Sequence, residues 1–591
     1  MFAGCKELRL FVGPVFTREV VTAPRRARLY VARAAYVLAL LVLLTTAWQV
    51  LAGTQEVRNL GDLARFGATV FAILAPLQLA VTMFFAALSA ASAVAAEKDR
   101  QTLTLLLLTH LSNVELVLGK LMAAMLNVFT LILAALPLFM LLSLLGGVSF
   151  EQIGRVFAVT VAAAFAAGSL GSTLALWREK TFQTLAMTAM AMVIWLAACE
   201  AALRLALARG LSDWAAIAAG FSPWRAMLEA TRPYPDELPV LGVIGNPVWL
   251  FLLVAAAVSV LLNGIAVWRV RKWNPSQEAG RVIPDTDDEH LEAKTPLRQL
   301  VAREVWDNPI IWREMRTWAY GRKILVVRLA YLLLFALAFG GLYSMGRQPG
   351  SLARADSAVV IVPFLVLSLV LINAQAVTAL TSERDARALD LLLVTDLTPK
   401  EFIYGKLGGI FYNTKEMIVL PLALCGYLWF RDALSTENLA YLTLGWLVMC
   451  VFAGMLGIHV GMTYATSRAG IAVSLGTVFF LFVGVAVCMR IMVAFSSSFQ
   501  VQLQPFLAFM VGGGIGLYVA LGIRNPSPAI LAASFGCPFA IFYAITSYLL
   551  GYTLAVFLML SFMFGFTTAA MLVPALFEFD VATGRTTGGE E

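Results

Sequence analysis

One charged segment occurs twice in this chain, each time between two long apolar runs. The first copy, residues 97–120, reads EKDRQTLTLLLLTHLSNVELVLGK, and the second, residues 383–406, reads ERDARALDLLLVTDLTPKEFIYGK. The two copies align without a gap at an offset of 286 residues, from 97 to 383. A repeat of this kind indicates that the chain is built from two related halves.

The composition places these halves in a membrane. Of the 591 residues, 60% are hydrophobic and only 13% are charged, whereas about a quarter of a soluble domain is charged. Apolar runs of about 20 residues cross the hydrocarbon core as helices, and the short alternating segments of a β-barrel do not occur. We therefore predict an all-α polytopic membrane protein with 12 to 14 spans. They lie near residues 30–52, 67–95, 120–145, 154–177, 182–208, 247–270, 325–345, 358–381, 407–430, 439–464, 470–495 and 552–576.

The region 496–550 leaves the span count open. Its two apolar stretches, 506–523 and 529–550, are either full spans or a re-entrant pair like the weaker segment 215–230. The net charge of +7 does not indicate a nucleic-acid partner, because Lys and Arg gather beside the spans as the positive-inside rule expects. That rule places the N-terminus in the cytoplasm. Six spans separate the two charged copies, so both face the cytoplasm in a parallel duplication.

A second repeat precedes the first span of each half. Residues 13–36 match residues 308–331 at an offset of 295 residues, from 13 to 308. Proline suits a first helical position, and apolar residues interleaved with Arg are typical of a helix lying in the membrane interface. A basic juxtamembrane tail is the alternative interpretation. The residues that define the predicted interfacial helix are Pro14, Arg18, Glu19, Pro309, Arg313 and Glu314.

These repeats divide the chain into three parts. Residues 1–272 form the first half and residues 308–591 the second. Residues 273–307 form a linker, which contains three prolines and an acidic cluster and shows no apolar periodicity.

Each copy of the charged segment predicts two helices. The first covers about 97–109 or 383–395, and its acidic start suits the positive end of a helix dipole. The second begins with a capping box, in which Ser or Thr stands three residues before Glu. It then carries Gly-Lys at the start of the third span, where the Gly favours close helix packing and the Lys reaches the interface. The residues of the first helices are Glu97, Asp99, Thr109, Glu383, Asp385 and Thr395. Those of the second are Ser112, Glu115, Gly119, Lys120, Thr398, Glu401, Gly405 and Lys406.

This pattern resembles the signature of ABC-2 type transporter permeases over both halves, roughly 13–270 and 308–576. In that family the short helix after the second span is the coupling helix that contacts the ATPase, and two six-span half-permeases pair. The resemblance implies that Glu97–Thr109 and Glu383–Thr395 are ATPase-coupling segments. It also implies two copies of a cytoplasmic ABC ATPase as partners, in the plasma membrane and most simply the bacterial inner membrane. Here both halves are fused, and the region 496–550 departs from the pattern.

The sequence contains no G-x-x-x-x-G-K-[ST] phosphate loop, because both Gly-Lys pairs are followed by Leu. We therefore expect no catalytic, metal or cofactor site in this chain, with ATP and Mg²⁺ bound by the partner. The expected function is the permease subunit of an ATP-binding-cassette exporter of unknown substrate. A membrane scaffold or regulatory anchor that retains the permease fold is the alternative.

Overall fold

The computed structural model describes residues 13–579, apart from 15, 19, 22–26, 55–58, 101, 179–180, 235–245, 275–305, 317–323, 347–353, 386–387, 394, 396, 465, 488–489, 491–498, 523–525, 550 and 578. The described regular structure is helical throughout, and eleven of its helices are long and apolar enough to span a membrane. The prediction of an all-α polytopic membrane protein is therefore confirmed.

The helices of the first half are α2 (Ala27–Thr54), α3 (Leu60–Asp99), α4 (Thr102–Leu108), α5 (Asn113–Leu144), α6 (Phe150–Trp177), α7 (Thr181–Ala208), α8 (Ser212–Gly220), α9 (Pro223–Thr231) and α10 (Pro247–Trp273). Those of the second are α11 (Pro309–Arg316), α12 (Ile324–Met345), α13 (Arg354–Asp385), α14 (Ala388–Leu393), α15 (Pro399–Asn413), α16 (Lys415–Phe430), α17 (Thr436–Thr463), α18 (Ser467–Phe479) with the π-helical turn η4 (Phe480–Gly484), α20 (Phe499–Leu521), α21 (Pro528–Leu549) and α22 (Thr553–Phe577).

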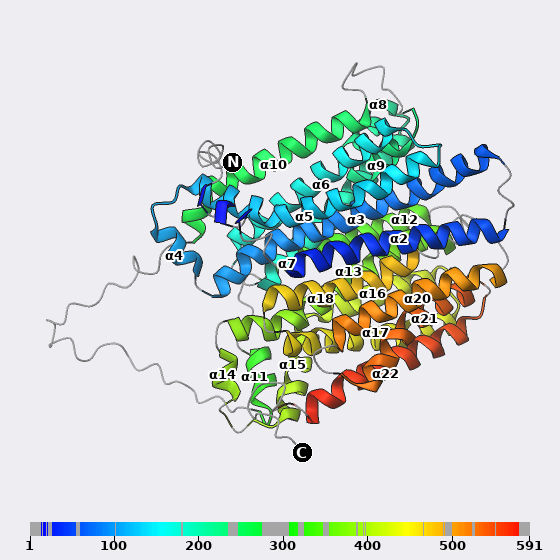
Figure 1. Cartoon of the computed structure of the whole chain (residues 1–591). Helices are drawn as coiled ribbons and strands as arrows, with labels where there is room; N and C mark the ends of the chain where they lie inside the picture. Colours follow the sequence, from blue (N-terminus) through cyan, green and yellow to red (C-terminus); the bar gives the residue numbers. More distant parts are fainter. Residues whose placement is uncertain are drawn as a thin grey trace, which may run out of the picture.

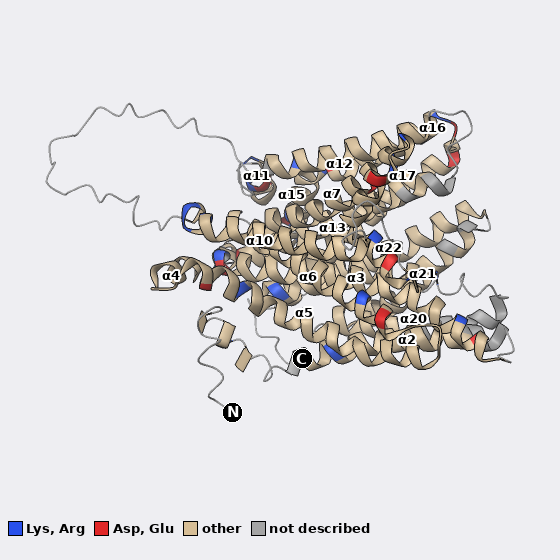
Figure 2. Cartoon of the chain, turned by 90° about the horizontal axis from the view of Figure 1, so that it is seen from above, with Lys and Arg blue, Asp and Glu red and all other residues tan. Residues whose placement is uncertain are grey.

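The repeat of the sequence extends to the helix boundaries. Helices α5, α6 and α7 begin at Asn113, Phe150 and Thr181, and α15, α17 and α18 begin at Pro399, Thr436 and Ser467, the positions aligned with them by the repeat of the charged segment. The two halves lie side by side, and α4 and α14 lie at the same end of the bundle (Figure 1). This end, where α11 also lies, is called the α4 end below. Figure 2 shows charged residues around α4 and α11, whereas most of the helical surface carries none.

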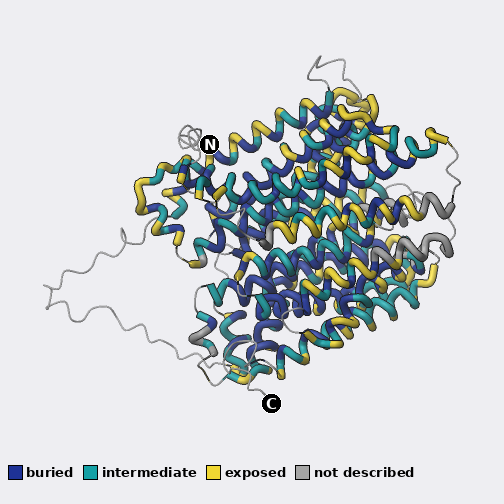
Figure 3. The backbone as a smooth tube through the Cα atoms, viewed as in Figure 1, coloured by how far each residue is buried: buried dark blue, intermediate teal, exposed yellow. Residues whose placement is uncertain are grey.

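The same close crossing holds the second and fourth spans together in each half. A Cβ on Gly171 of α6 would lie 2.6 Å from the carbonyl oxygen of Ala87 in α3. A Cβ on Gly457 of α17, the aligned position of the second half, would lie 2.5 Å from the Cβ of Ala376 in α13. Small residues let membrane helices approach closely in the absence of a hydrophobic drive between them. Figure 3 shows that buried residues run through the middle of the helix bundle and that exposed ones lie mostly on its outer helices.

Three features differ between the halves. The third span of the first half is the single helix α5, but its counterpart breaks at Thr414 into α15 and α16. At this break the backbone N–H of Thr414 donates to the carbonyl oxygen of Ile410. The backbone N–H of Met417 in turn donates to the carbonyl oxygen of Thr414. The predicted dipping segment 215–230 forms the two short helices α8 and α9, whereas α20 and α21 are helices of 23 and 22 residues. Within the described residues their apolar parts are shorter, Met510–Leu521 and Pro528–Ala544, and neither helix is among the eleven candidate spans.

The short helix before the first span also packs on the third span in both halves. Asn308 caps α11 by accepting from the backbone N–H groups of Ile310 and Ile311, both at 3.0 Å, and its amide donates to the carbonyl of Glu401 at 2.9 Å. At the position equivalent to Asn308, Gly13 lies against Glu115, with φ of 69° and room for no Cβ. The described start of the predicted N-terminal helix, Gly13, therefore lies against the start of the third span. Pro14 and Arg18 are exposed there, and Glu19 lies outside the described residues.

Two glycines of α15 permit α11 to lie flat on it. A Cβ on Gly405 would come within 2.7 Å of the Cβ of Ile310, and one on Gly409 within 2.5 Å of the Cβ of Glu314. Gly408, on the same helix, has only ordinary contacts at 3.5 Å and beyond.

We expect Gly409→Val to lower the stability of the protein in detergent by about 1–3 kcal/mol, because overpacking displaces α11. Gly408→Val is the matched control and is expected to change stability by less than about 0.5 kcal/mol. Thermal unfolding followed by size-exclusion chromatography measures both. Equal losses for the two variants would contradict this packing.

Candidate functional site

The second span of each half ends in a cation that binds the end of the fourth span. The ammonium Nζ of Lys98 donates to the carbonyl oxygens of Leu176 at 2.6 Å and of Arg178 at 2.8 Å. The guanidinium of Arg384 donates to the carbonyl oxygens of Met462 and Tyr464, the equivalent pair in the second half. Cations satisfy the free carbonyls at a helix C-terminus and its negative dipole end. The two contacts fix where the charged segment leaves the bundle.

The short helices and the capped starts that follow also agree between the halves. The hydroxyls of Thr109 and Thr395 each donate to a carbonyl three residues earlier, at 2.6 Å. Ser112 is the N-cap of α5 and Thr398 that of α15, and each accepts at 3.2 Å from the backbone N–H of the Glu three residues later. Both predicted capping boxes are formed, with Glu115 and Glu401 reaching back to the cap residue.

A buried lysine joins the third span to the end of the second span. Lys120 of α5 is 6% exposed and pairs with the carboxylate of Glu97 at the end of α3. Lys406 of α15 is 1% exposed and lies 2.7 Å from the carboxylate of Glu383 at the end of α13. The prediction that these lysines extend to the membrane interface is wrong. The ammonium group of each lysine can stay buried between helices because a carboxylate compensates its charge.

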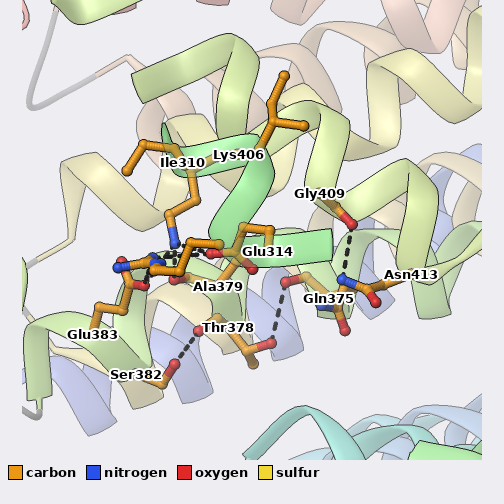
Figure 4. A network of polar contacts seen from close by, with 12 residues as sticks. Ile310, Glu314, Gln375, Thr378, Ala379, Ser382, Glu383, Lys406, Gly409 and Asn413 are labelled. Atoms are coloured by element: carbon orange, nitrogen blue, oxygen red, sulfur yellow. Dashed lines mark hydrogen bonds and ion pairs between the residues drawn. The ribbon is translucent and has the colours of Figure 1, made fainter. Parts of the chain in front are cut away.

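In the second half this pair belongs to a network of four charges (Figure 4). The Nζ of Lys406 also lies 2.8 Å from the carboxylate of Glu314, on α11. Arg313, the preceding residue, pairs with Glu314 at 3.0 Å and with Glu383. Two cations thus face two carboxylates, and the formal charge of the network is zero. Helix α11, which precedes the first span of this half, is locked to the second and third spans.

The network keeps Glu314 ionised. Burial opposes the charged form, but the Lys406 ammonium and then the Arg313 guanidinium outweigh it, so that the pKa of Glu314 lies below its ordinary value. A carboxylate with a lowered folded-state pKa contributes stability above its unfolded pKa of about 4.3. That contribution is lost as the pH falls through the lower folded value.

The predicted helix start at Glu97 and Glu383 is wrong. Helix α3 continues to Asp99 and α13 to Asp385, so these acidic residues lie at helix C-termini, where the dipole disfavours them. The lateral helices α4 and α14 begin only at Thr102 and Ala388. Ion pairs with the lysines of the third spans explain why carboxylates lie at these ends. The side chain of Asp99 lies outside the described residues.

The two charged segments also meet each other. The guanidinium of Arg100, at the end of α3, lies 3.1 Å from the carboxylate of Asp385, at the end of α13. The Asp385 side chain is only 5% exposed and also accepts from the hydroxyl of Ser467. Arg468 donates to the carbonyl of Ala93 at 2.9 Å. A polar contact therefore joins the halves at the α4 end, beside both lateral helices.

The sequence patterns did not single out two groups that the structure places at this site. Lys98 and Arg384 are cations at equivalent positions of the two aligned segments, so the alignment alone could have identified them as candidates. Arg271 and Asn113 belong to different segments and have no counterpart pair in the second half, where Pro399 stands at the position of Asn113.

No protein-family model matches this chain, and no curated protein matches its sequence.

We expect Lys406→Met to destabilise the protein by about 3–5 kcal/mol, because the buried Glu314 and the half-buried Glu383 lose their ammonium partner. Lys120→Met is the matched control and is expected to cost less, since the Glu97 side chain is 26% exposed and regains water. Thermal unfolding in detergent measures both variants. A loss for Lys120→Met as large as that for Lys406→Met would contradict the difference between the two networks.

Proposed function

We propose that this chain is the membrane-spanning permease subunit of an ATP-binding-cassette exporter, powered by two copies of a separate cytoplasmic ATPase. The observation that carries the proposal is the pair of lateral helices α4 and α14 at one end of the bundle (Figure 1). Each follows a second span whose terminal cation binds the end of the fourth span, and each precedes a capped third span. A displacement of either lateral helix is therefore transmitted to the second, third and fourth spans of its half.

We infer that helix α4 lies outside the hydrocarbon core, where it presents apolar side chains. Helix α3 has 40 residues and is about 60 Å long, twice the thickness of the hydrocarbon core. Leu105 and Leu108 on α4 are 64% and 58% exposed, and Thr109 and His110 beside them are also exposed. Leucines exposed in this position suit a surface that a partner protein covers. We propose that the ATPase docks here.

In this proposal the chain itself binds no nucleotide, and ATP and Mg²⁺ belong to the partner. The α4 end faces the cytoplasm of a bacterial cell, and the N-terminus lies on the same side of the inner membrane. ATP-driven closure of two ATPase subunits displaces α4 and α14 and shifts the halves between inward-facing and outward-facing states.

The double variant Leu105→Asp, Leu108→Asp tests the docking surface. We expect recovery of the ATPase with the purified membrane subunit to fall about tenfold or more, the effect of about 1.4 kcal/mol of lost binding energy. Leu60→Asp is the matched control, because Leu60 is 84% exposed at the opposite end of α3. Variants of Glu97 or Glu383 are less suitable, since both residues belong to internal ion pairs.

Co-purification with the wild-type chain in mild detergent, followed by assay of ATP hydrolysis, is the primary measurement. If no ATPase is recovered with the wild-type chain, the proposal fails and a scaffold or anchor that recruits other partners replaces it. If the double variant recovers as much ATPase as Leu60→Asp, the docking surface is not on α4.

A further inference from the structure

Arg271, in the last turn of α10, makes three hydrogen bonds to the end of α4, the turn that follows it and the start of α5. Its Nε donates to the side-chain oxygen of Asn113 at 2.8 Å. Its two terminal nitrogens donate to the carbonyl oxygens of Leu107 and Leu111, both at 3.3 Å. These carbonyls lie at the end of α4 and in the turn that follows it. A guanidinium suits this position, because it satisfies free carbonyls at a helix C-terminus and presents several donors in a fixed plane.

Asn113 also forms a hydrogen bond with α10. Its side-chain amide donates to the carbonyl of Val267, at 3.1 Å. Asn113 is also the first residue of α5, directly after the cap residue Ser112. Arg271 and Asn113 therefore connect three elements: the end of α4, the start of α5 and the last two turns of α10. We name these two residues the α4–α10 clamp.

An apolar cluster lies behind the clamp. Leu103 and Leu107 of α4 belong to a small buried cluster that is separate from the main core of the bundle. Its other members come from four spans and are Val94, Leu116, Val117, Ala175, Leu176, Ala266 and Val270, the last two on α10. Helix α4 thus packs on its own small cluster at the α4 end, and the clamp closes the polar side of the same contact. Packing and hydrogen bonds together favour joint movement of α4 and α10.

The described residues of the second half show a different arrangement. Pro399 occupies the position of Asn113, and proline has neither a side-chain amide nor a backbone N–H. Leu389 of α14 belongs to the main core instead of a separate cluster. The end of α13 is held by α11, through Glu314, Arg313 and Lys406. The two lateral helices therefore have different mechanical connections.

We propose that Arg271 and Asn113 are positioning residues that make α4 and α10 one moving body. The first coupling segment then transmits its displacement to the sixth span of its half, whereas the second transmits it through α11. The source of the displacement rests on the proposed function, but the rigid connection does not.

Amide hydrogen exchange of residues 102–111 tests the connection in the purified chain without any ATPase. We expect Arg271→Ala to speed exchange in this segment about tenfold, which corresponds to about 1.4 kcal/mol of local stability. Arg269→Ala is the matched control. It removes the same charge two residues away, where the guanidinium stacks on Trp268 at 4.8 Å, and it should change exchange in this segment less than twofold.

Asn113→Pro is a second variant, and it introduces the residue that the second half has at this position. Proline is tolerated at the first position of a helix, so we expect α5 to form and the clamp alone to be lost. Exchange in residues 102–111 should again rise about tenfold. If exchange in this segment is unchanged in both Arg271→Ala and Asn113→Pro, the clamp does not hold α4 and the inference is wrong.

A distance measurement separates positioning from simple stability. Spin labels at Val260→Cys on α10 and Phe562→Cys on α22, both highly exposed, report movement of the last span of each half in a cysteine-free background. In the complex with the ATPase, we expect ATP to change this distance in the wild-type and Arg269→Ala chains but not in Arg271→Ala. The Arg271→Ala chain should still bind the ATPase and hydrolyse ATP. An ATP-dependent change of the same size in Arg271→Ala would overturn the inference.

The two proposals fail in different ways. Recovery of no ATPase with the wild-type chain would overturn the proposed function, while the exchange result for the clamp would stand. Unchanged exchange in the clamp variants would overturn the inference, while the docking of an ATPase on α4 would remain.

Discussion

The rest of the α4 end depends on one interaction, the buried lysine at the start of each third span. A membrane protein ordinarily places such a lysine where its ammonium reaches water. Here Lys406 is buried among two glutamates and an arginine, and Lys120 is buried beside Glu97. A charge removed from water is costly unless it is paired with good geometry. The pairing therefore fixes the distance between the second and third spans, and the lateral helix between them has to bridge that distance.

This constraint explains why the charged segment could be recognised but not fully interpreted from the sequence. The capping boxes at Ser112 and Thr398 are local patterns, and local patterns determine helix starts well. The acidic residues Glu97 and Glu383 look equally suited to a helix start. Their partners are the lysines 23 residues later, and only the fold determines that these pairs meet. The sequence therefore places these acidic residues at the wrong end of a helix, because the lysines that neutralise them lie far away along the chain.

The repeat predicted the architecture more securely than the charges. The constant offset between the two copies, and the even number of spans that separates them, place both lateral helices at one end, as observed (Figure 1). The offset does not predict where the halves differ. The third span of the second half breaks at four consecutive polar residues, Asn413–Glu416, which interrupt its apolar run. The prediction of an unbroken span over 407–430 gave this local signal no weight. Nor does the sequence alone connect Arg271 with Asn113, because tertiary contact between α10 and α4 creates that pair.

The differences between the halves follow from their fusion into one chain. Two identical subunits would carry every contact twice, but a fused chain is free of that requirement. The pair Arg100–Asp385 has no counterpart, because Ala386 stands where an equivalent arginine would be needed. The first lateral helix is attached to α10, and the end of the second span of the other half is attached to α11. One side of the α4 end therefore carries a clamp within its half and the other carries a buried charge network. The pair Arg100–Asp385 and the bond from Arg468 to Ala93 join the two sides. Equal displacements of α4 and α14 would therefore meet different contacts in the two halves, which is not possible in a symmetric pair of identical subunits.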